Sequence, residues 1–299
     1  MKKFKKLLSL ALGCLSAACL IAAIVLAVLH YVEDTRSEDV FDELRDDAAD
    51  REEATLTPAP VETPSPVSEI TPTPMPTDTP KPTPVLVENP YIDSFLANED
   101  MAAWLQIPDT VIDYPVMWTP RDENYYLLRG FDGSRNRNGC LILDTDSCLD
   151  PLTTNLIIHG HNMRSGAMFG SLMDYESEEF CRDHPNIILY TEECQRNYEV
   201  IAVFRSQVYR KSETVFKFYK FFQADTQEEF DDFYENIMKL ALYDTGVTAE
   251  FGDHFLTLST CAYHVEQGRF VVVAKEIESG NQYLPLADSK VDEQNPKTD

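Results

Sequence analysis

The chain has 299 residues, with 51 Asp and Glu against 25 Lys and Arg, which gives a formal net charge of −26 at pH 7. This acidic balance argues against a nucleic-acid-binding protein, because phosphate binding needs a basic face. The length is sufficient for one large domain or two small ones with a sizeable hydrophobic core.

The N-terminal segment has the pattern of a retained membrane anchor. Four lysines occur within the first six residues, and the 23 residues from 7 to 29 carry no charged side chain. As a helix they would span roughly 34 Å, which is enough to cross a bilayer. A cleavable signal peptide usually has a shorter apolar run. Lysines before the apolar run and acidic residues after it predict a cytoplasmic basic tail at residues 1–6 and a single-pass transmembrane anchor at residues 7–31, with everything beyond it outside the cell.

A proline-rich segment separates this anchor from the rest of the chain. Between Leu56 and Pro90, proline recurs at nearly every second or third position and is mixed with threonine. Such a composition cannot build a core and favours extended polyproline II. We therefore predict an acidic and Pro/Thr-rich extracellular linker at residues 32–87, a folded domain at 88–283 and a disordered tail at 284–299.

The folded domain reads as mostly β. Apolar residues at loosely helical spacing in residues 91–107 predict one or two short helices. Seven runs rich in β-branched and aromatic residues predict strands: Val111–Met117, Cys140–Asp144, Asn155–Gly160, Asn186–Thr191, Tyr198–Tyr209, His254–Thr260 and Arg269–Ile277. Residues 225–246 predict one amphipathic helix between the fifth and sixth strands. This pattern favours a barrel or sandwich of about 190 residues.

One cysteine lies at the end of a predicted strand. In the run Phe255–Cys261 the two leucines share one face, whereas Ser259 and Cys261 share the other. The leucine face suits a core, so we expect the cysteine on the more polar outer face, where a nucleophile can line a groove. The alternative is that Cys261 is simply buried, as free cysteines often are. Disulfides stay open among the other cysteines of this domain: Cys140, Cys148, Cys181 and Cys194.

An arginine and a histidine could complete a catalytic group. Arg269 starts the next predicted strand and would return close to Cys261 across a hairpin, where a guanidinium can stabilise an oxyanion. A nucleophilic thiol also needs a proton-transfer partner, usually histidine. His161 follows a buried-looking strand that ends in glycine. His159 and His161 could instead bind a metal, but no third ligand follows at a recognisable spacing, so we predict none.

Together these motifs resemble a known family. The segment "IIHGHNM", the downstream "TLSTC" and then "GRFVVVAK" are similar to the sortases, and specifically to class B. Class B sortases are membrane-anchored cysteine transpeptidases of Gram-positive bacteria. The resemblance covers about residues 89–278, and a helix like that at residues 225–243 is typical of class B rather than class A. It implies a sortase-like closed β-barrel of about eight strands, with N-terminal helices and one long helix inserted between late strands.

The resemblance also implies roles for particular residues. Cys261 matches the nucleophile, His161 the general acid and base, and Arg269 the residue that stabilises the oxyanion. Three further residues are expected near the bound peptide: Ser259, Leu127 and His159. Class B sortases often carry tyrosine at the position of His159, and Asp-Asn-Glu where this chain has residues 122–124 in the order Asp-Glu-Asn. Both differences concern substrate contacts rather than the catalytic trio.

The implied reaction is an exchange of one amide for another. The enzyme would cleave a C-terminal sorting motif of secreted proteins and join the threonine carbonyl, through a thioester, to an amino group of peptidoglycan or a pilin, with no cofactor. One alternative is an extracellular cysteine peptidase or cell-wall hydrolase, although such hydrolases usually place cysteine before histidine. A second is a non-catalytic surface protein, although this C-terminus lacks the sorting motif, apolar segment and basic tail of wall-attached adhesins. The sorting motif, the acceptor amine and the oligomeric state stay open.

Overall fold

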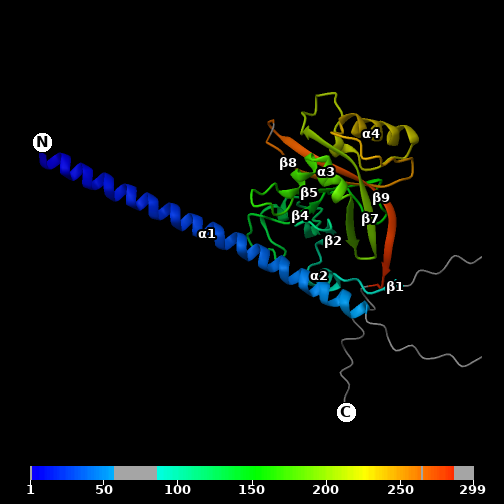
Figure 1. The fold of residues 1–299 in the computed structure, drawn as a ribbon, viewed down its shortest axis with the longest axis horizontal. Coiled ribbons are helices and arrows are strands. Elements are labelled where there is room, and N and C mark those ends of the chain that lie inside the picture. The colour runs from blue at the N-terminus through cyan, green and yellow to red at the C-terminus, as the bar shows by residue number, and fades with distance from the viewer. Residues whose placement is uncertain (1, 57–85, 264, 286–299) are drawn as a thin grey trace, which may run out of the picture.

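The computed structural model describes residues 2–56, 86–263 and 265–285, in which a β-barrel lies beside one end of a long helix (Figure 1). The α-helices are α1 (Lys2–Leu56), α2 (Ile92–Ala97), α3 (Glu178–Asp183) and α4 (Gln227–Leu240). The strands are β1 (Leu86–Val87), β2 (Met101–Gln106), β3 (Asp113–Met117), β4 (Leu141–Leu143), β5 (Asn155–Gly160), β6 (Asn186–Thr191), β7 (Cys194–Gln207), β8 (Phe255–Cys261) and β9 (Gly268–Tyr283). Short 3₁₀ helices are η1 (Tyr125–Leu128), η2 (Ser171–Glu176) and η3 (Phe218–Lys220).

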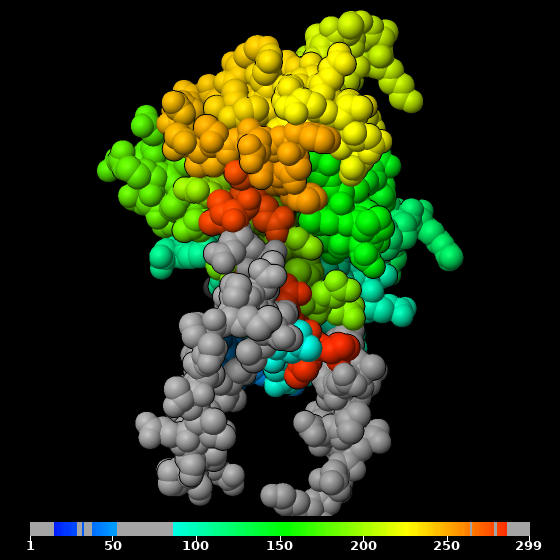
Figure 2. Space-filling view, turned by 90° about the vertical axis from the view of Figure 1, so that its right-hand side faces the viewer, coloured from blue at the N-terminus to red at the C-terminus, as the bar shows by residue number. Residues whose placement is uncertain are grey.

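The strands form one closed sheet. Their order is β1-β9-β7-β6-β2-β3-β4-β5-β8, and β9 pairs with β8 as well, so eight strands close a barrel and β1 is added outside the ring. The short β1 pairs with the far end of β9 at Gln282 and Tyr283, and Figure 2 shows the start of the folded domain (cyan) beside the end of β9 (red). The predicted fold class, a closed barrel with a long helix between late strands, is confirmed.

The segment 91–107 differs from the helical prediction. Only its first part is helical, as α2, and the second part is the strand β2, which pairs with both β3 and β6. Ala103, Trp104 and Leu105 are consecutive and all buried. A helix on a surface buries one stripe, whereas a strand with both faces covered buries every residue. The loose helical spacing of apolar residues concealed this two-sided burial.

Two hydrophobic cores lie on opposite faces of the late strands. Alternate residues of β8 point into the barrel, among them Leu256 and Leu258, which belong to the larger cluster. Phe255 lies on the other face, in a second cluster with Phe230 and Phe233 of α4. The face of β8 that we expected to be outer is therefore covered by α4 and by the chain that leads into it.

The C-terminal part of α1 packs against the barrel. Phe41 is buried and its ring meets that of Tyr114 edge-on, with 5.3 Å between ring centroids. Arg45 Nε donates to the carbonyl of Asp113 at 2.9 Å. Of the linker predicted at residues 32–87, residues 32–56 are thus helical, residues 57–85 lie outside the described chain and residues 86–87 form β1. The predicted tail at 284–299 lies outside the described chain from residue 286 onward.

No helix within the described residues is both long enough and apolar enough to span a membrane. The anchor predicted at residues 7–31 falls in part on positions whose side chains are outside the description.

Candidate active site

Three neighbouring strands bring Cys261, His161 and Arg269 to one end of the barrel. β5 and β8 are parallel, and Gly160 pairs with Thr260, so the residues that follow them, His161 and Cys261, emerge side by side. β8 and β9 are antiparallel, and Cys261 pairs directly with Arg269. Paired residues on adjacent strands are about 5 Å apart between their Cα atoms. The strand register therefore converges a thiol, an imidazole and a guanidinium from positions up to 108 apart in sequence (269 − 161).

Hydrogen bonds to the backbone orient the histidine and the cysteine. His161 Nε2 lies 2.8 Å from the carbonyl oxygen of Leu127 in η1. Because a carbonyl only accepts, this ring nitrogen carries the hydrogen, which leaves the lone pair of a neutral ring on Nδ1. Asn162 Nδ2 donates to the carbonyl of Cys261 at 2.7 Å and so ties the end of β8 to the segment after β5. Both catalytic candidates are held by main-chain contacts rather than left mobile.

The thiol and the guanidinium are both accessible. Cys261 and Arg269 are half-buried, and Cys261 is a free thiol. The Arg269 guanidinium donates to the carbonyl oxygens of Gly268 and Gln267, at 3.0 and 3.4 Å through Nη1. These bonds fold the side chain back on its own hairpin, and a ligand with an acceptor oxygen would compete with them. The outer-face expectation thus holds for Cys261 itself.

Ser259 lies differently from its prediction. It was expected on an outer face beside the peptide groove, but it is 1 % exposed. Its strand neighbours pair on both sides, and the second hydrophobic core covers this face of β8. Ser259 still lines a cavity of about 210 Å³, together with His159 and Arg269. Although Ser259 is buried from solvent, its side chain could contact a ligand that occupies this cavity.

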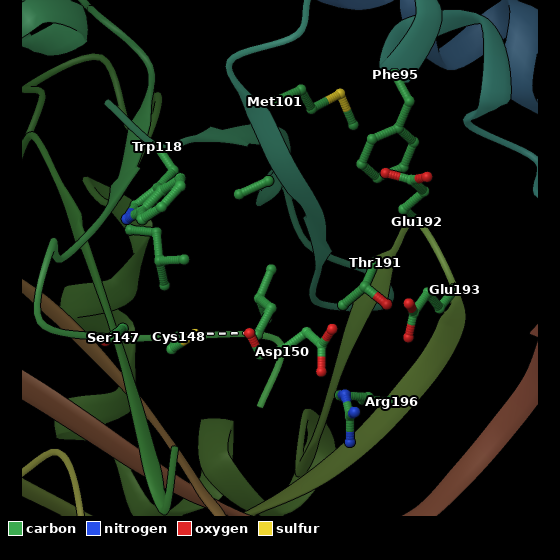
Figure 3. Close-up of a pocket in the computed structure, with 13 residues that line it drawn as sticks. Phe95, Met101, Trp118, Ser147, Cys148, Asp150, Thr191, Glu192, Glu193 and Arg196 are labelled. Carbon is green, nitrogen blue, oxygen red and sulfur yellow. Dashed lines mark hydrogen bonds between the residues drawn. The ribbon is translucent and has the colours of Figure 1, made fainter. Parts of the chain in front are cut away.

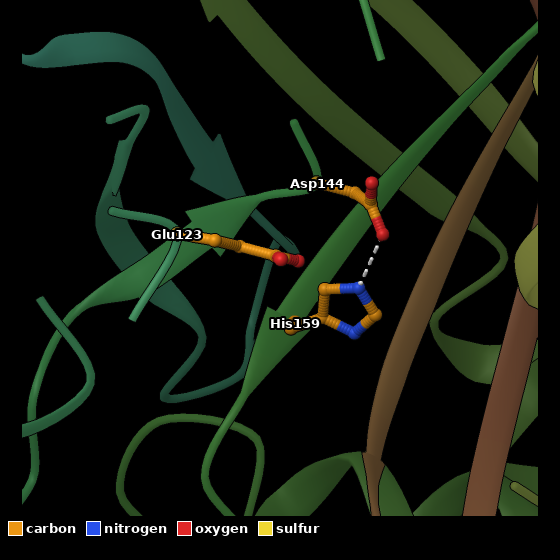
Figure 4. Close-up of side chains that lie close together, drawn as sticks. All are labelled: Glu123, Asp144 and His159. Carbon is orange, nitrogen blue, oxygen red and sulfur yellow. Dashed lines mark hydrogen bonds and ion pairs between the residues drawn. The ribbon is translucent and has the colours of Figure 1, made fainter. Parts of the chain in front are cut away.

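His159 and Leu127 also make contacts that the sequence did not suggest. His159 Nε2 lies 3.1 Å from Asp144 Oδ2, at the end of β4 (Figure 4). Burial would raise the pKa of the Asp144 carboxyl, but the hydrogen bond from His159 and further interactions outweigh burial and lower that pKa below its ordinary value. Leu127 is half-buried, and its carbonyl, not an apolar contact, ties it to His161.

Sequence reasoning missed Asn162 and Asp144. Asn162 follows His161 directly, and an amide beside a catalytic residue gives no signal by itself. Asp144 ends the predicted strand Cys140–Asp144, and a carboxylate just past an apolar strand is a common enough pattern to go unnoticed. Neither contact could be inferred without knowing that β4, β5 and β8 are adjacent.

A larger cavity of about 300 Å³ lies elsewhere on the barrel (Figure 3). Its lining includes Trp118, Glu192 and Arg196, and also Cys148, whose thiol donates to the carbonyl of Asp150 at 3.1 Å. None of the three converging residues lines this cavity. The candidate active site at Cys261, His161 and Arg269 is therefore separate from this larger cavity.

Comparison with known proteins agrees with this fold. The Sortase domain model matches residues 105–277. Sortase B of Listeria monocytogenes is 33 % identical over 182 residues, which cover 60 % of this chain and 70 % of that protein. Sortase B of B. anthracis has a solved structure with a TM-score of 0.55 and 30 % identity, covering 65 % of this chain and 89 % of that one. A mutant form of Clostridium perfringens sortase B gives a TM-score of 0.57 at 26 % identity, covering 63 % and 87 %.

The closed mixed barrel together with the matched Sortase domain identifies a cysteine transpeptidase of the cell-wall anchoring kind. The chain belongs to the sortase family, and within it to class B.

Proposed function

We propose that Cys261 is the nucleophile of this transpeptidase. Its sulfur attacks the carbonyl carbon of a threonine in the sorting motif of a secreted protein, and the C–N bond that follows the threonine breaks. A thioester forms and an amine leaves. An incoming amine then attacks the thioester carbonyl, so that the second amide forms as the C–S bond breaks. The observation that supports this role best is the strand register, which places Cys261 beside both His161 and Arg269.

His161 transfers the protons in this scheme. With Nε2 donating to the Leu127 carbonyl, the nitrogen that exchanges protons is Nδ1. It takes the thiol proton of Cys261 and delivers it to the departing amine. In the second half it accepts a proton from the incoming amine and returns the thiol to its starting form. The fixed Leu127 carbonyl holds the imidazole ring in one orientation throughout both halves of the reaction.

Arg269 stabilises the oxyanion that forms on the threonine carbonyl oxygen. A guanidinium keeps its charge at any physiological pH and offers several donors in one plane. Arg269 is the direct strand partner of Cys261. To reach the oxyanion it exchanges its bonds to the Gly268 and Gln267 carbonyls for bonds to the substrate.

The substrates follow from this chemistry and from the class. The donor is a secreted protein with a C-terminal sorting motif, and the acceptor is an amino group of peptidoglycan or of a pilin. The cavity that Ser259, His159 and Arg269 share supplies polar contacts for the peptide beside the thiol. The half-buried side chain of Leu127 adds an apolar contact for the peptide near His161.

We also propose that residues 7–31 anchor the enzyme in the cell membrane with its catalytic domain outside. The support comes from the sequence: an uncharged run of 23 residues between 7 and 29, lysines before it and acidic residues after it. Because Phe41 and Arg45 of α1 contact the barrel, the catalytic domain would lie close to the outer end of this anchor. Protease accessibility of the barrel on intact cells tests the orientation: digestion from outside is expected, and full protection would refute it.

A mass-spectrometric assay tests the catalytic roles. The full-length chain is incubated with a pool of candidate sorting peptides, with and without an amine nucleophile. Amide exchange and a trapped thioester are expected for the parent chain. Cys261→Ala should lose both, and His161→Ala and Arg269→Lys should slow turnover by at least about a hundredfold.

The matched control is Cys148→Ala, which removes another half-buried free thiol that lines the separate, larger cavity. Its activity should equal that of the parent chain. Full transpeptidation by Cys261→Ala, or loss of activity in Cys148→Ala alone, would show that the nucleophile is not at the strand end.

A further inference from the structure

Three ligating side chains from separate segments meet beside the thiol. Glu123 precedes η1, Asp144 follows β4 and His159 lies near the end of β5, and one oxygen or nitrogen atom of each lies within 4.8 Å of the others (Figure 4). The nearest measured pair, His159 Nε2 and Asp144 Oδ2, is 3.1 Å apart. The figure shows the Glu123 carboxylate directed toward the same space. This set of one imidazole and two carboxylates is typical of sites for divalent cations.

A fourth polar atom points to a ligand at the same place. Ser259 pairs with His159 across β5 and β8, so both side chains lie on one face of the sheet. Ser259 is 1 % exposed, its hydroxyl oxygen has no hydrogen-bond partner among the described residues, and it lines the cavity that also contains Glu123 and Asp144. Leaving a buried hydroxyl unbonded costs free energy. A bound ion with its water shell would supply the missing contact.

We propose that Glu123, Asp144 and His159 bind a divalent transition-metal cation, with Mn²⁺ or Zn²⁺ as the best fit. At metal–ligand distances of about 2.0–2.2 Å, adjacent ligand atoms of an octahedral site are roughly 3 Å apart. The 3.1 Å between Nε2 and Oδ2 matches that spacing. The three ligand atoms lie within 4.8 Å of one another, so the carboxylate of Glu123, which is exposed, needs to move by at most about 1.8 Å (4.8 − 3.0) to reach that spacing. The imidazole disfavours Mg²⁺ and Ca²⁺.

The charges around the cavity favour a cation there. Three carboxylates line it, those of Glu123, Asp144 and Asp146, against two cationic side chains, Lys220 and Arg269. Lys220 is mostly exposed and lies 4.0 Å from Asp146. Arg269 bonds to carbonyls of its own hairpin. With neutral histidine the cavity therefore keeps an excess of one negative charge, although Lys220 also interacts with the Asp144 carboxylate.

A cation here would affect the position of the catalytic histidine. Glu123 lies two residues before η1, whose Leu127 carbonyl accepts the hydrogen bond of His161 Nε2. A metal that joins Glu123 to Asp144 and His159 would connect this segment to the sheet. It would hold the Leu127 carbonyl against His161 without itself touching the reacting atoms. The ion would act on turnover only indirectly, by positioning the segment that holds His161.

Binding is tested with Mn²⁺ on the full-length chain, by electron paramagnetic resonance of free Mn²⁺ and by isothermal titration calorimetry. Mn²⁺ prefers oxygen and nitrogen ligands, so it avoids the thiol of Cys261, and a Cys261→Ser background removes that competitor altogether. One Mn²⁺ per chain is expected. Glu123→Gln and Asp144→Asn should each weaken binding at least tenfold, because loss of even a supporting contact to a metal ligand costs about 10–100-fold.

The matched control is Asp146→Asn, which removes a carboxylate from the same cavity but not from the cluster. It should bind Mn²⁺ within about threefold of the parent chain, because it alters the local charge but no ligand. Equal weakening by Asp146→Asn and Glu123→Gln would reveal unspecific attraction and overturn the proposal. Unchanged binding in Glu123→Gln, an exposed position that cannot unfold the barrel, would overturn it as well. The measurement needs no turnover, so it is independent of the role proposed for Cys261.

Discussion

A glycine beside η1 offers a direct test of how the fold positions His161. Gly139 has a φ of +63°, and a Cβ built there would lie 2.4 Å from the carbonyl oxygen of Leu127 and 2.8 Å from that of Tyr126. Both contacts are with backbone, which cannot rotate away. The Leu127 carbonyl is also the partner of His161 Nε2. Gly139→Ala should therefore push His161, the proposed general acid and base, out of place through its own hydrogen-bond partner.

The size of the effect follows from these distances. To restore an ordinary contact of 3.4 Å, the Leu127 carbonyl must move by 1.0 Å (3.4 − 2.4). The left-handed backbone costs alanine about 1–2 kcal/mol, and loss of the bond to His161 adds about 0.5–1.5 kcal/mol. We expect a loss of about 2–3 kcal/mol in the free energy of unfolding. A displacement of about 1 Å in a catalytic group can lower kcat/KM by roughly a hundredfold.

Gly133→Ala is the matched control for Gly139→Ala. Gly133 has a similar φ of +74°, but the nearest atom to its Cβ would be the Tyr125 hydroxyl at 3.8 Å. Gly133→Ala should lower the free energy of unfolding by only the cost of the left-handed backbone, about 1–2 kcal/mol. It should leave kcat/KM within about twofold of the parent chain. Urea unfolding and transpeptidation of a sorting peptide measure both quantities. If the two variants behave alike in both assays, the close approach to Leu127 does not position His161 and the reasoning is wrong.

Three further outcomes test the packing. Phe233→Ala should lose about 3–5 kcal/mol in the free energy of unfolding, because Phe233 is 1 % exposed in the second core. Its control, Phe251→Ala, changes a side chain that is 43 % exposed and should lose under about 1 kcal/mol. Similar losses for the two variants in urea titrations would refute the second core. The hydrogen bonds from the Asp225 backbone and from Thr226 lower the pKa of Glu229, so its contribution is present above about pH 4.3 and is lost as pH falls through the lower folded pKa. Glu229→Gln should therefore be less stable than the parent chain at pH 7 and equal to it near pH 2, and a gap that persists at acid pH would contradict this. Phe41→Ala should release the docked part of α1 and speed tryptic cleavage after Arg45, and unchanged cleavage would refute the docking.

Local patterns in the sequence were enough to place most of the barrel. Each of the seven predicted strands is present, since runs of β-branched and aromatic residues between turn residues need no tertiary information to be recognised. The helix α4 was evident from its cap and its apolar stripe. The strand β2 was not, because Ala103, Trp104 and Leu105 are covered on both faces, and two-sided burial erases the period-two signal.

The sequence by itself determined seven of the strands, the inserted helix and the identities of three chemically capable residues, Cys261, His161 and Arg269. Tertiary structure decided which faces became interior and which distant side chains meet. Ser259 has the polarity of an outer residue, but α4 packs a second core over that face and buries it. Asp144 and His159 meet through the antiparallel pairing of β4 with β5, and Glu123 joins them from the separate segment before η1. Periodicity is a property of neighbours along the chain, whereas closure of a barrel depends on pairings between strands far apart in sequence, which no local pattern encodes.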